Sequence, residues 1–128
     1  MTVSADKYKG RTILVVEDDN ISRTLFREIF KNTGCSLKYT NSAAETFEFF
    51  ESNPPPNLVL MDIRLPDVMG VELTKKLKTK YPDLVVVAQT AFAYQNLEDE
   101  CMEAGMVAFL SKPIQQSKLF SLLDRLEW

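Results

Sequence analysis

Short runs of consecutive apolar residues recur along this chain, and they alternate with segments in which apolar residues are spaced three or four apart. Continuous runs rich in Val, Ile and Leu are typical of strands buried on both faces of a parallel sheet. Spacing of three or four is typical of helices with one buried face. We therefore predict strands at residues 12–17, 36–40, 58–62, 84–88 and 106–110. We predict helices at residues 21–33, 42–52, 71–80, 95–104 and 115–126.

Residues with strong turn or capping preferences separate these segments. Asn20 is a candidate N-cap for the first helix, and Gly34 is a natural stop after it. Ser42 to Glu45 matches a capping box at the start of the second helix. Pro54 to Pro56 ends that helix, because three prolines leave no helix or central strand intact. Gly105 is expected to end the fourth helix.

The strict alternation of strand and helix predicts an α/β fold. Such a chain forms a parallel sheet with helices on both faces and right-handed crossovers. The strand at 36–40 has fewer apolar residues than the others, which indicates an edge position. At 128 residues the chain is expected to form one domain over residues 11–128, preceded by a polar tether at residues 1–10.

The composition excludes several classes of function. The net charge of −3 provides no basic surface for nucleic acid, and no apolar run approaches the length of a membrane span. The chain contains no histidine, so its chemistry must use carboxylates, hydroxyls, lysine or groups from a partner. Cys35 and Cys101 lack metal or disulfide spacing, which favours two core residues in a reducing compartment.

Polar side chains follow four of the five predicted strands. Asp62 ends the buried strand at 58–62, and Glu17 and Asp18 end the first strand. Thr90 follows the fourth strand, and Lys112 follows the fifth. Because the carboxyl ends of parallel strands meet at one edge, and ligands bind in the crevice there, these side chains are expected to converge.

Such a group of carboxylates favours a cation. Two carboxylates ~4 Å apart repel by roughly 4 kcal/mol at an effective dielectric of ~20. Either one carboxylate takes a proton or a cation sits between them. Oxygen ligands without His or Cys favour Mg²⁺ or Ca²⁺, and a few carboxylates with waters suit Mg²⁺. A hydroxyl and a lysine nearby suit phosphate, so the set is compatible with phosphoryl transfer to Asp62.

The order of these motifs resembles the receiver domain of two-component response regulators. The resemblance extends from about Arg11 to Leu126. It rests on VVEDD (15–19), LVLMDIRLP (58–66), Gly70, QTAFA (89–93), Phe109 and SKP (111–113). The resemblance implies a flavodoxin-like (βα)5 doubly wound sheet with strand order 2-1-3-4-5. Each motif alone is weak evidence for this family, whereas the occurrence of all of them in order at successive strand ends is specific to it.

The resemblance also implies roles at the acidic edge. Asp62 is the implied phosphoacceptor, which attacks a phosphohistidine on a partner. Asp18 is the implied direct ligand of Mg²⁺, and Glu17 is implied to bind it through water. The backbone carbonyl of Arg64 is the implied third protein ligand. Asp19 is expected to cap the first helix instead of binding the ion.

Further implied roles concern the phosphoryl group. Thr90 and Lys112 are expected to bind its oxygens, and the small Ala91 leaves room for it. Phe109 occupies the position of the aromatic switch residue, on the face made by the last strand and the fourth and fifth helices. The bond before Pro113 is expected to be cis.

The chain departs from the commonest family pattern at several positions. Glu17 replaces a commoner Asp, and Phe109 replaces a commoner Tyr, so its ring has no hydroxyl to donate. Met69 stands where an Asp often precedes the glycine. Arg64 and Phe92 occupy positions that tune the phosphoryl lifetime in the family, and the sequence does not predict that lifetime.

Three sequence segments, LMDIRLP, AQTAFA and AGMVAFLSKPI, are similar to the corresponding segments of receivers within hybrid sensor histidine kinases. This similarity predicts a cytoplasmic receiver within a sensor kinase chain. The domain alone is expected to promote only its own phosphorylation and dephosphorylation. Its expected partner is a kinase phosphotransfer domain or a histidine phosphotransfer protein, docking on the helix that begins near Ile21. No contact with nucleic acid or membrane is expected.

Alternative readings stay open. One is a stand-alone or truncated response regulator, and another is a pseudo-receiver binding module that never takes phosphate. A third is a haloacid-dehalogenase-type phosphatase, which needs a second Asp two positions after the nucleophile. Arg64 occupies that place, which argues against the phosphatase.

Overall fold

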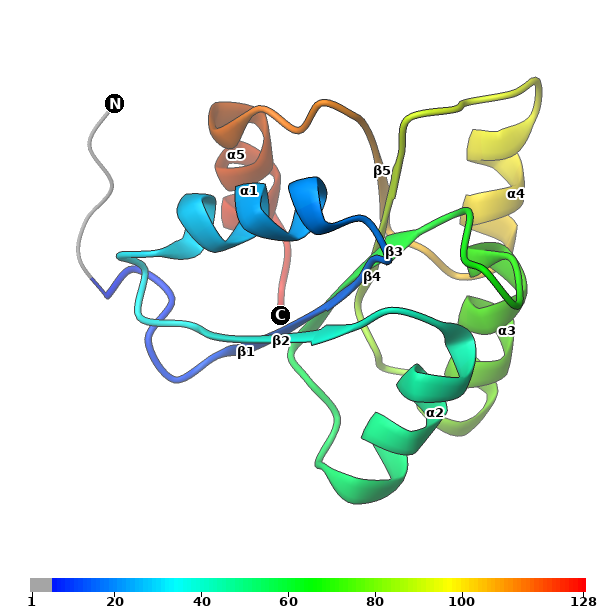
Figure 1. Cartoon of the computed structure of the whole chain (residues 1–128), viewed down its shortest axis with the longest axis horizontal. Helices are drawn as coiled ribbons and strands as arrows, with labels where there is room; N and C mark the ends of the chain where they lie inside the picture. Colours follow the sequence, from blue (N-terminus) through cyan, green and yellow to red (C-terminus); the bar gives the residue numbers. More distant parts are fainter. Residues whose placement is uncertain (1–5) are drawn as a thin grey trace.

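A five-stranded parallel sheet lies between two layers of helices in the computed structural model of the chain, which describes residues 6–128 (Figure 1). The strands are β1 (Thr12–Val16), β2 (Ser36–Thr40), β3 (Leu58–Asp62), β4 (Val86–Thr90) and β5 (Ala108–Ser111). The helices are α1 (Asn20–Phe30), α2 (Ala43–Ser52), α3 (Gly70–Lys80), α4 (Leu97–Glu103) and α5 (Gln116–Arg125). The sheet order β2-β1-β3-β4-β5 confirms the predicted fold and the edge position of β2.

Alternate residues of the central strands enter two separate cores. Val59 and Met61 of β3 pack on the side covered by α2, α3 and α4. Leu58 and Leu60 pack on the side covered by α1 and α5. Figure 1 shows these two helical layers on opposite faces of the sheet. Among residues 6–128, no helix combines the length and apolar character that crossing a membrane requires.

Side-chain caps define the starts of α1 and α2. The N-cap of α1 is Asp19, so the prediction of Asn20 as the cap was wrong by one residue. Ser42 caps α2 by accepting a hydrogen bond from Glu45 N, as the capping box predicted. Gly34 and Gly105 both have positive φ, which glycine adopts without a steric penalty.

The first helix ends earlier than predicted. α1 ends at Phe30 instead of residue 33. Thr33 is buried, and its hydroxyl donates to Phe30 O at 2.8 Å in the turn that follows. A side chain that bonds a nearby carbonyl in this way competes with continuation of the helix.

The last two strands lie about two residues further along the chain than the apolar runs predicted. β4 covers Val86–Thr90 instead of residues 84–88, and β5 begins at Ala108 instead of residue 106. Gln89 and Thr90 belong to β4, because Gln89 pairs with Asp62 and Thr90 pairs with Ser111. The sequence placed these two polar residues in a loop; in the structure the strand carries them to the sheet edge.

The segment before β1 packs against the domain over residues 6–10, where the sequence predicted a tether; residues 1–5 lie outside the described part of the chain. Tyr8 is buried, and the centroid of its ring lies 5.0 Å from the ring centroid of Trp128 and 5.8 Å from that of Phe120. Its hydroxyl donates to Asp124 Oδ1 at 3.1 Å, and Lys7 pairs with the same carboxylate at 2.8 Å. The packed structure therefore begins before residue 11.

Replacing Tyr8 tests whether this segment is integral to the domain. Tyr8→Ala is expected to lower the free energy of unfolding by about 3 kcal/mol, because it removes a buried ring and leaves a cavity. Lys9→Ala, at an exposed neighbouring position, is the matched control and should change it by less than about 0.5 kcal/mol. Urea unfolding of both variants measures the difference, and equal stabilities would show that residues 6–10 contribute no packing.

Candidate functional site

A pocket of about 270 Å³ opens at the carboxyl edge of the sheet, over the ends of β1, β3, β4 and β5. It is lined by residues from those strand ends and from the start of α1: Glu17, Asp18, Asp19, Ser22, Asp62, Arg64, Thr90, Ala91, Phe92 and Lys112. The structure thus brings together the strand-end side chains that the sequence predicted to converge.

Three carboxylates form the acidic centre of the pocket. One oxygen from each of Glu17, Asp18 and Asp62 lies within 4.8 Å of the others. Glu17 and Asp62 are buried, whereas Asp18 is exposed at the rim. Oxygen donors at this separation can share one divalent cation, and the lack of imidazole or thiolate donors among them suits Mg²⁺.

The Lys112 ammonium is the cation that the structure places against this cluster. Its Nζ donates to Glu17 Oε2 at 2.8 Å and lies 3.8 Å from Asp62 Oδ2. The pKa of Asp62 is raised to about 7, first by burial and second by the neighbouring Glu17 carboxylate, while Lys112 acts in the opposite direction. The lysine therefore offsets only part of the cost of burying two acids side by side.

Hydrogen bonds that involve backbone groups connect Glu17 and Asp62 to neighbouring residues. Arg23 reaches back from α1, and its Nε donates to Glu17 O at 2.7 Å. The backbone N–H of Arg64 donates to Asp62 Oδ1 at 3.3 Å. Arg23 could not be identified from the sequence, because a contact from a helix side chain to the backbone carbonyl after the preceding strand leaves no pattern in the sequence.

Asp19 takes a different role from its neighbour Asp18. It accepts hydrogen bonds from Ser22 N at 3.2 Å and Ser22 Oγ at 2.9 Å, which lower the pKa of Asp19. This confirms the interpretation that Asp19 caps α1. Asp18 is the member of the pair whose carboxylate joins the acidic cluster.

The other side of the pocket is formed by the segment after β4. Thr90 is buried, and its Oγ1 accepts a hydrogen bond from Phe92 N at 3.1 Å. Ala91 follows it, exposed and small, in the pocket lining. The Arg64 guanidinium lies 5.0 Å from the centre of the Phe92 ring, so these two exposed side chains meet at the mouth of the pocket.

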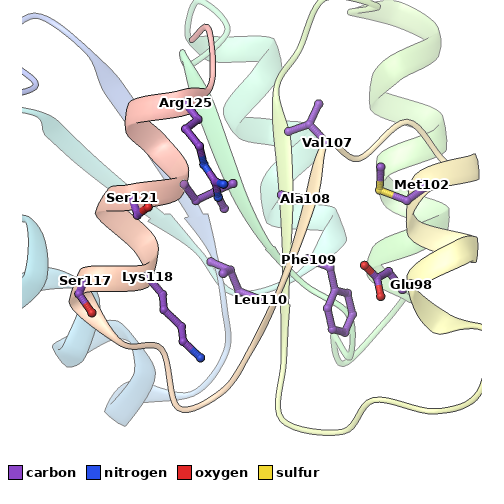
Figure 2. A pocket seen from close by; sticks show the side chains of 11 residues that line it. Glu98, Met102, Val107, Ala108, Phe109, Leu110, Ser117, Lys118, Ser121 and Arg125 are labelled. Carbon is purple, nitrogen blue, oxygen red and sulfur yellow. The ribbon is translucent and has the colours of Figure 1, made fainter.

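Phe109 lies outside this pocket, on β5, where its half-buried ring packs against the core under α4. Figure 2 shows Phe109 on the α4 side of the strand, beside Glu98, whereas Leu110 and Lys118 lie on the α5 side. A groove of about 520 Å³ runs along this face between α4, β5 and α5. The Lys112–Pro113 peptide bond that follows is cis, as predicted.

Gly70 allows the segment after Asp62 to fold back closely on the strand. A Cβ at Gly70 would stand 2.1 Å from the backbone oxygen of Asp62, a distance that no side chain tolerates. Gly70 N also donates to Ile63 O at 2.7 Å. Glycine is therefore required here by the close approach of two backbones at the site.

Comparison with known sequences identifies the family to which a chain with this fold and this strand-edge site belongs. Residues 13–124 match the response regulator receiver domain family, and the chain belongs to that family. It is 36% identical over 106 residues to the polar-differentiation response regulator DivK of Brucella ovis, covering 81% of this chain and 85% of that one. The DivK of Brucella anthropi is 35% identical over the same length.

Solved structures show the same fold. A CheY-like receiver domain protein from Methanospirillum hungatei superimposes with a TM-score of 0.82 at 28% identity, covering 89% of this chain and 90% of that one. A CheY-like receiver domain from Methylobacillus flagellatus gives a TM-score of 0.79 at 26% identity, covering 91% and 98% of the two chains.

The raised pKa of Asp62 predicts how stability depends on pH. The unfolded chain releases this proton near its ordinary pKa, whereas the folded protein holds it to about pH 7. Because the folded state binds more protons in that window, the free energy of unfolding falls as pH rises through it. Asp62→Asn, which stays neutral, is therefore expected to be more stable than the wild type at about pH 8, by up to about 4 kcal/mol.

Thermal unfolding without divalent cations measures this effect. The advantage of Asp62→Asn should shrink toward about pH 5, where Asp62 is protonated and also neutral. Asp83→Asn, an exposed turn residue, controls for the general loss of one negative charge. An advantage that is the same at both pH values would contradict the raised pKa.

Proposed function

We propose that Asp62 is the phosphoacceptor of a His–Asp phosphorelay and that Glu17 and Asp18 support it by holding Mg²⁺. The observation that carries the proposal is the cluster of three carboxylates within 4.8 Å, with Lys112 Nζ between two of them. Receiver domains generally bind Mg²⁺ and interact with histidine kinases or phosphotransfer proteins, and this chain belongs to that family.

The donor set fits the ion. Asp18 and Asp62 would bind it directly, Glu17 through water, and the backbone carbonyl of Arg64 would complete the protein ligands. Three carboxylates near one lysine leave net negative charge at the site, which a divalent cation offsets. When bound, Mg²⁺ would neutralise charge on the transferring phosphoryl oxygens.

Asp62 would attack the phosphorus atom of a partner phosphohistidine. A bond forms between Asp62 Oδ and phosphorus as the phosphorus–nitrogen bond breaks, and the imidazole nitrogen keeps the electron pair. Attack requires the carboxylate form of Asp62, and a cation at the site would favour that form against the effect of burial.

Lys112 and Thr90 would bind the phosphoryl oxygens after transfer. Lys112 has the reach, because its Nζ already lies 3.8 Å from Asp62 Oδ2, and it would exchange Glu17 for a phosphoryl oxygen. The Thr90 hydroxyl is occupied as an acceptor by Phe92 N, which leaves its proton free to donate. Ala91 would leave space for the phosphoryl group. Phe109 and the face formed by α4, β5 and α5 would change in response to phosphorylation of Asp62.

The partner surface and the context of the domain also belong to the proposal. Ile21 is 80% exposed and Leu25 is 37% exposed on α1, beside the pocket, which supports docking of the donor there. The similarity to DivK, of which the chain covers 85%, favours a response regulator of that kind over a hybrid-kinase receiver. The hybrid-kinase context and a cytoplasmic location stay predictions from sequence motifs.

Intact mass measured after incubation with Mg²⁺ and acetyl phosphate tests the phosphoacceptor role. The wild type is expected to gain one phosphoryl group, because a small acyl phosphate can replace the phosphohistidine donor. The adduct should be absent without Mg²⁺, and absent in Asp62→Asn, which lacks the nucleophile.

Asp83→Asn is the matched control, because it removes an exposed carboxylate that lies outside the pocket without removing the nucleophile. It should still form the adduct at saturating Mg²⁺. A wild type that forms no adduct with any acyl- or amido-phosphate donor would instead support a pseudo-receiver, and an adduct retained by Asp62→Asn would place the phosphoacceptor elsewhere.

A further inference from the structure

Asp67 fastens the loop between β3 and α3 to the N-terminus of a different helix. Its Oδ1 accepts from Ala43 N at 2.9 Å, and its Oδ2 accepts from Ala44 N at 2.9 Å. These N–H groups open α2 and have no acceptor within the helix. The two bonds lower the pKa of Asp67, so the carboxylate is charged at the positive end of the helix dipole.

Asp67 and Ser42 divide the capping of α2 between them. Ser42 Oγ accepts from Glu45 N at 3.1 Å, and Ser42 O accepts from Thr46 N at 3.0 Å. Asp67 accepts hydrogen bonds from the two preceding N–H groups, those of Ala43 and Ala44. Ser42 adjoins the helix in sequence, whereas Asp67 comes from more than 20 residues away, so among these capping bonds it is the Asp67 pair that ties the start of α2 to a distant part of the chain.

The loop held in this way carries one wall of the acidic pocket. Its base is fixed at Gly70, whose N–H donates to Ile63 O, and by the bridge between Arg64 and Met69. Arg64 lines the pocket and donates its backbone N–H to Asp62 Oδ1. Asp67 lies at the far end of the loop, and two bonds through one planar carboxylate restrict both its position and its rotation.

We propose that Asp67 is a positioning residue for the cation site: by clamping the loop to α2, it holds the backbone carbonyl of Arg64 where it can complete the Mg²⁺ ligands. This inference rests on the proposed function, since it assumes that the acidic cluster binds Mg²⁺. It assigns a role to a carboxylate that lies outside the pocket lining and touches none of its acids.

Calorimetric titration with Mg²⁺ alone tests the proposal without any phosphoryl transfer. Asp67→Ala removes both bonds and is expected to raise the Kd for Mg²⁺ about tenfold, the lower end of the effect of losing an outer-shell partner. Asp67→Asn keeps one acceptor oxygen and should give an intermediate Kd; it also serves if the alanine variant does not fold.

Ser42→Ala is the matched control for helix stability. It removes a hydrogen bond from the same helix terminus and should lower the melting temperature as Asp67→Ala does, but it leaves the loop clamp intact. Its Kd for Mg²⁺ should equal that of the wild type. A wild-type Kd in both Asp67 variants, or an equal weakening in Ser42→Ala, would overturn the positioning role.

The wild type and Asp18→Asn separate this inference from the proposed function. Binding of Mg²⁺ to the wild type and its loss in Asp18→Asn support the cation site itself. If the wild type binds no Mg²⁺, the proposed function fails; if it binds and the Asp67 variants bind equally well, only the clamp fails.

Discussion

Repulsion among carboxylates at one edge of the sheet is the constraint on which the site depends. Glu17 and Asp62 are buried side by side, with Asp18 at the rim, and Lys112 Nζ lies 2.8 Å from one acid and 3.8 Å from the other. Two carboxylates ~4 Å apart cost roughly 4 kcal/mol at an effective dielectric of ~20. One lysine offsets only part of this, and the raised pKa of Asp62 results first from burial and second from the neighbouring Glu17 carboxylate. A cation or a proton relieves the rest, which links ion binding to the reactive form of Asp62.

The fold supplies this crowding through a simple geometric rule. Parallel strands carry the residues at their carboxyl ends to the same edge, so β1, β3, β4 and β5 each deliver a side chain to one pocket. The buried strands are paired along the sheet up to that edge, Arg23 donates to the backbone oxygen of Glu17, and Asp67 accepts from the first backbone N–H of α2. The polar site is thus held by contacts that lie largely outside it.

Most of the fold and the main site residues could be predicted from the sequence, because both depend on local patterns. Apolar runs locate the strands; Asp62 follows such a run directly, and Thr90 and Lys112 each follow one after a single intervening residue. The bounds of β4 could not be predicted, since Gln89 and Thr90 are polar yet pair with residues of the neighbouring strands. The contacts of Tyr8 and Asp67 could not be predicted, because their partners are distant in the sequence. Tyr8 packs against Phe120 and Trp128, and Asp67 bonds to the start of α2.

The titration of the Asp62 carboxyl carbon by NMR, with and without Mg²⁺, tests this account most directly. Without the ion, the account predicts a midpoint near pH 7, well above that of an ordinary aspartate. With saturating Mg²⁺, the midpoint should fall, because the cation binds the ionised form. An ordinary midpoint without Mg²⁺, or one that Mg²⁺ does not move, would contradict the claim that a crowded acidic pocket governs this site.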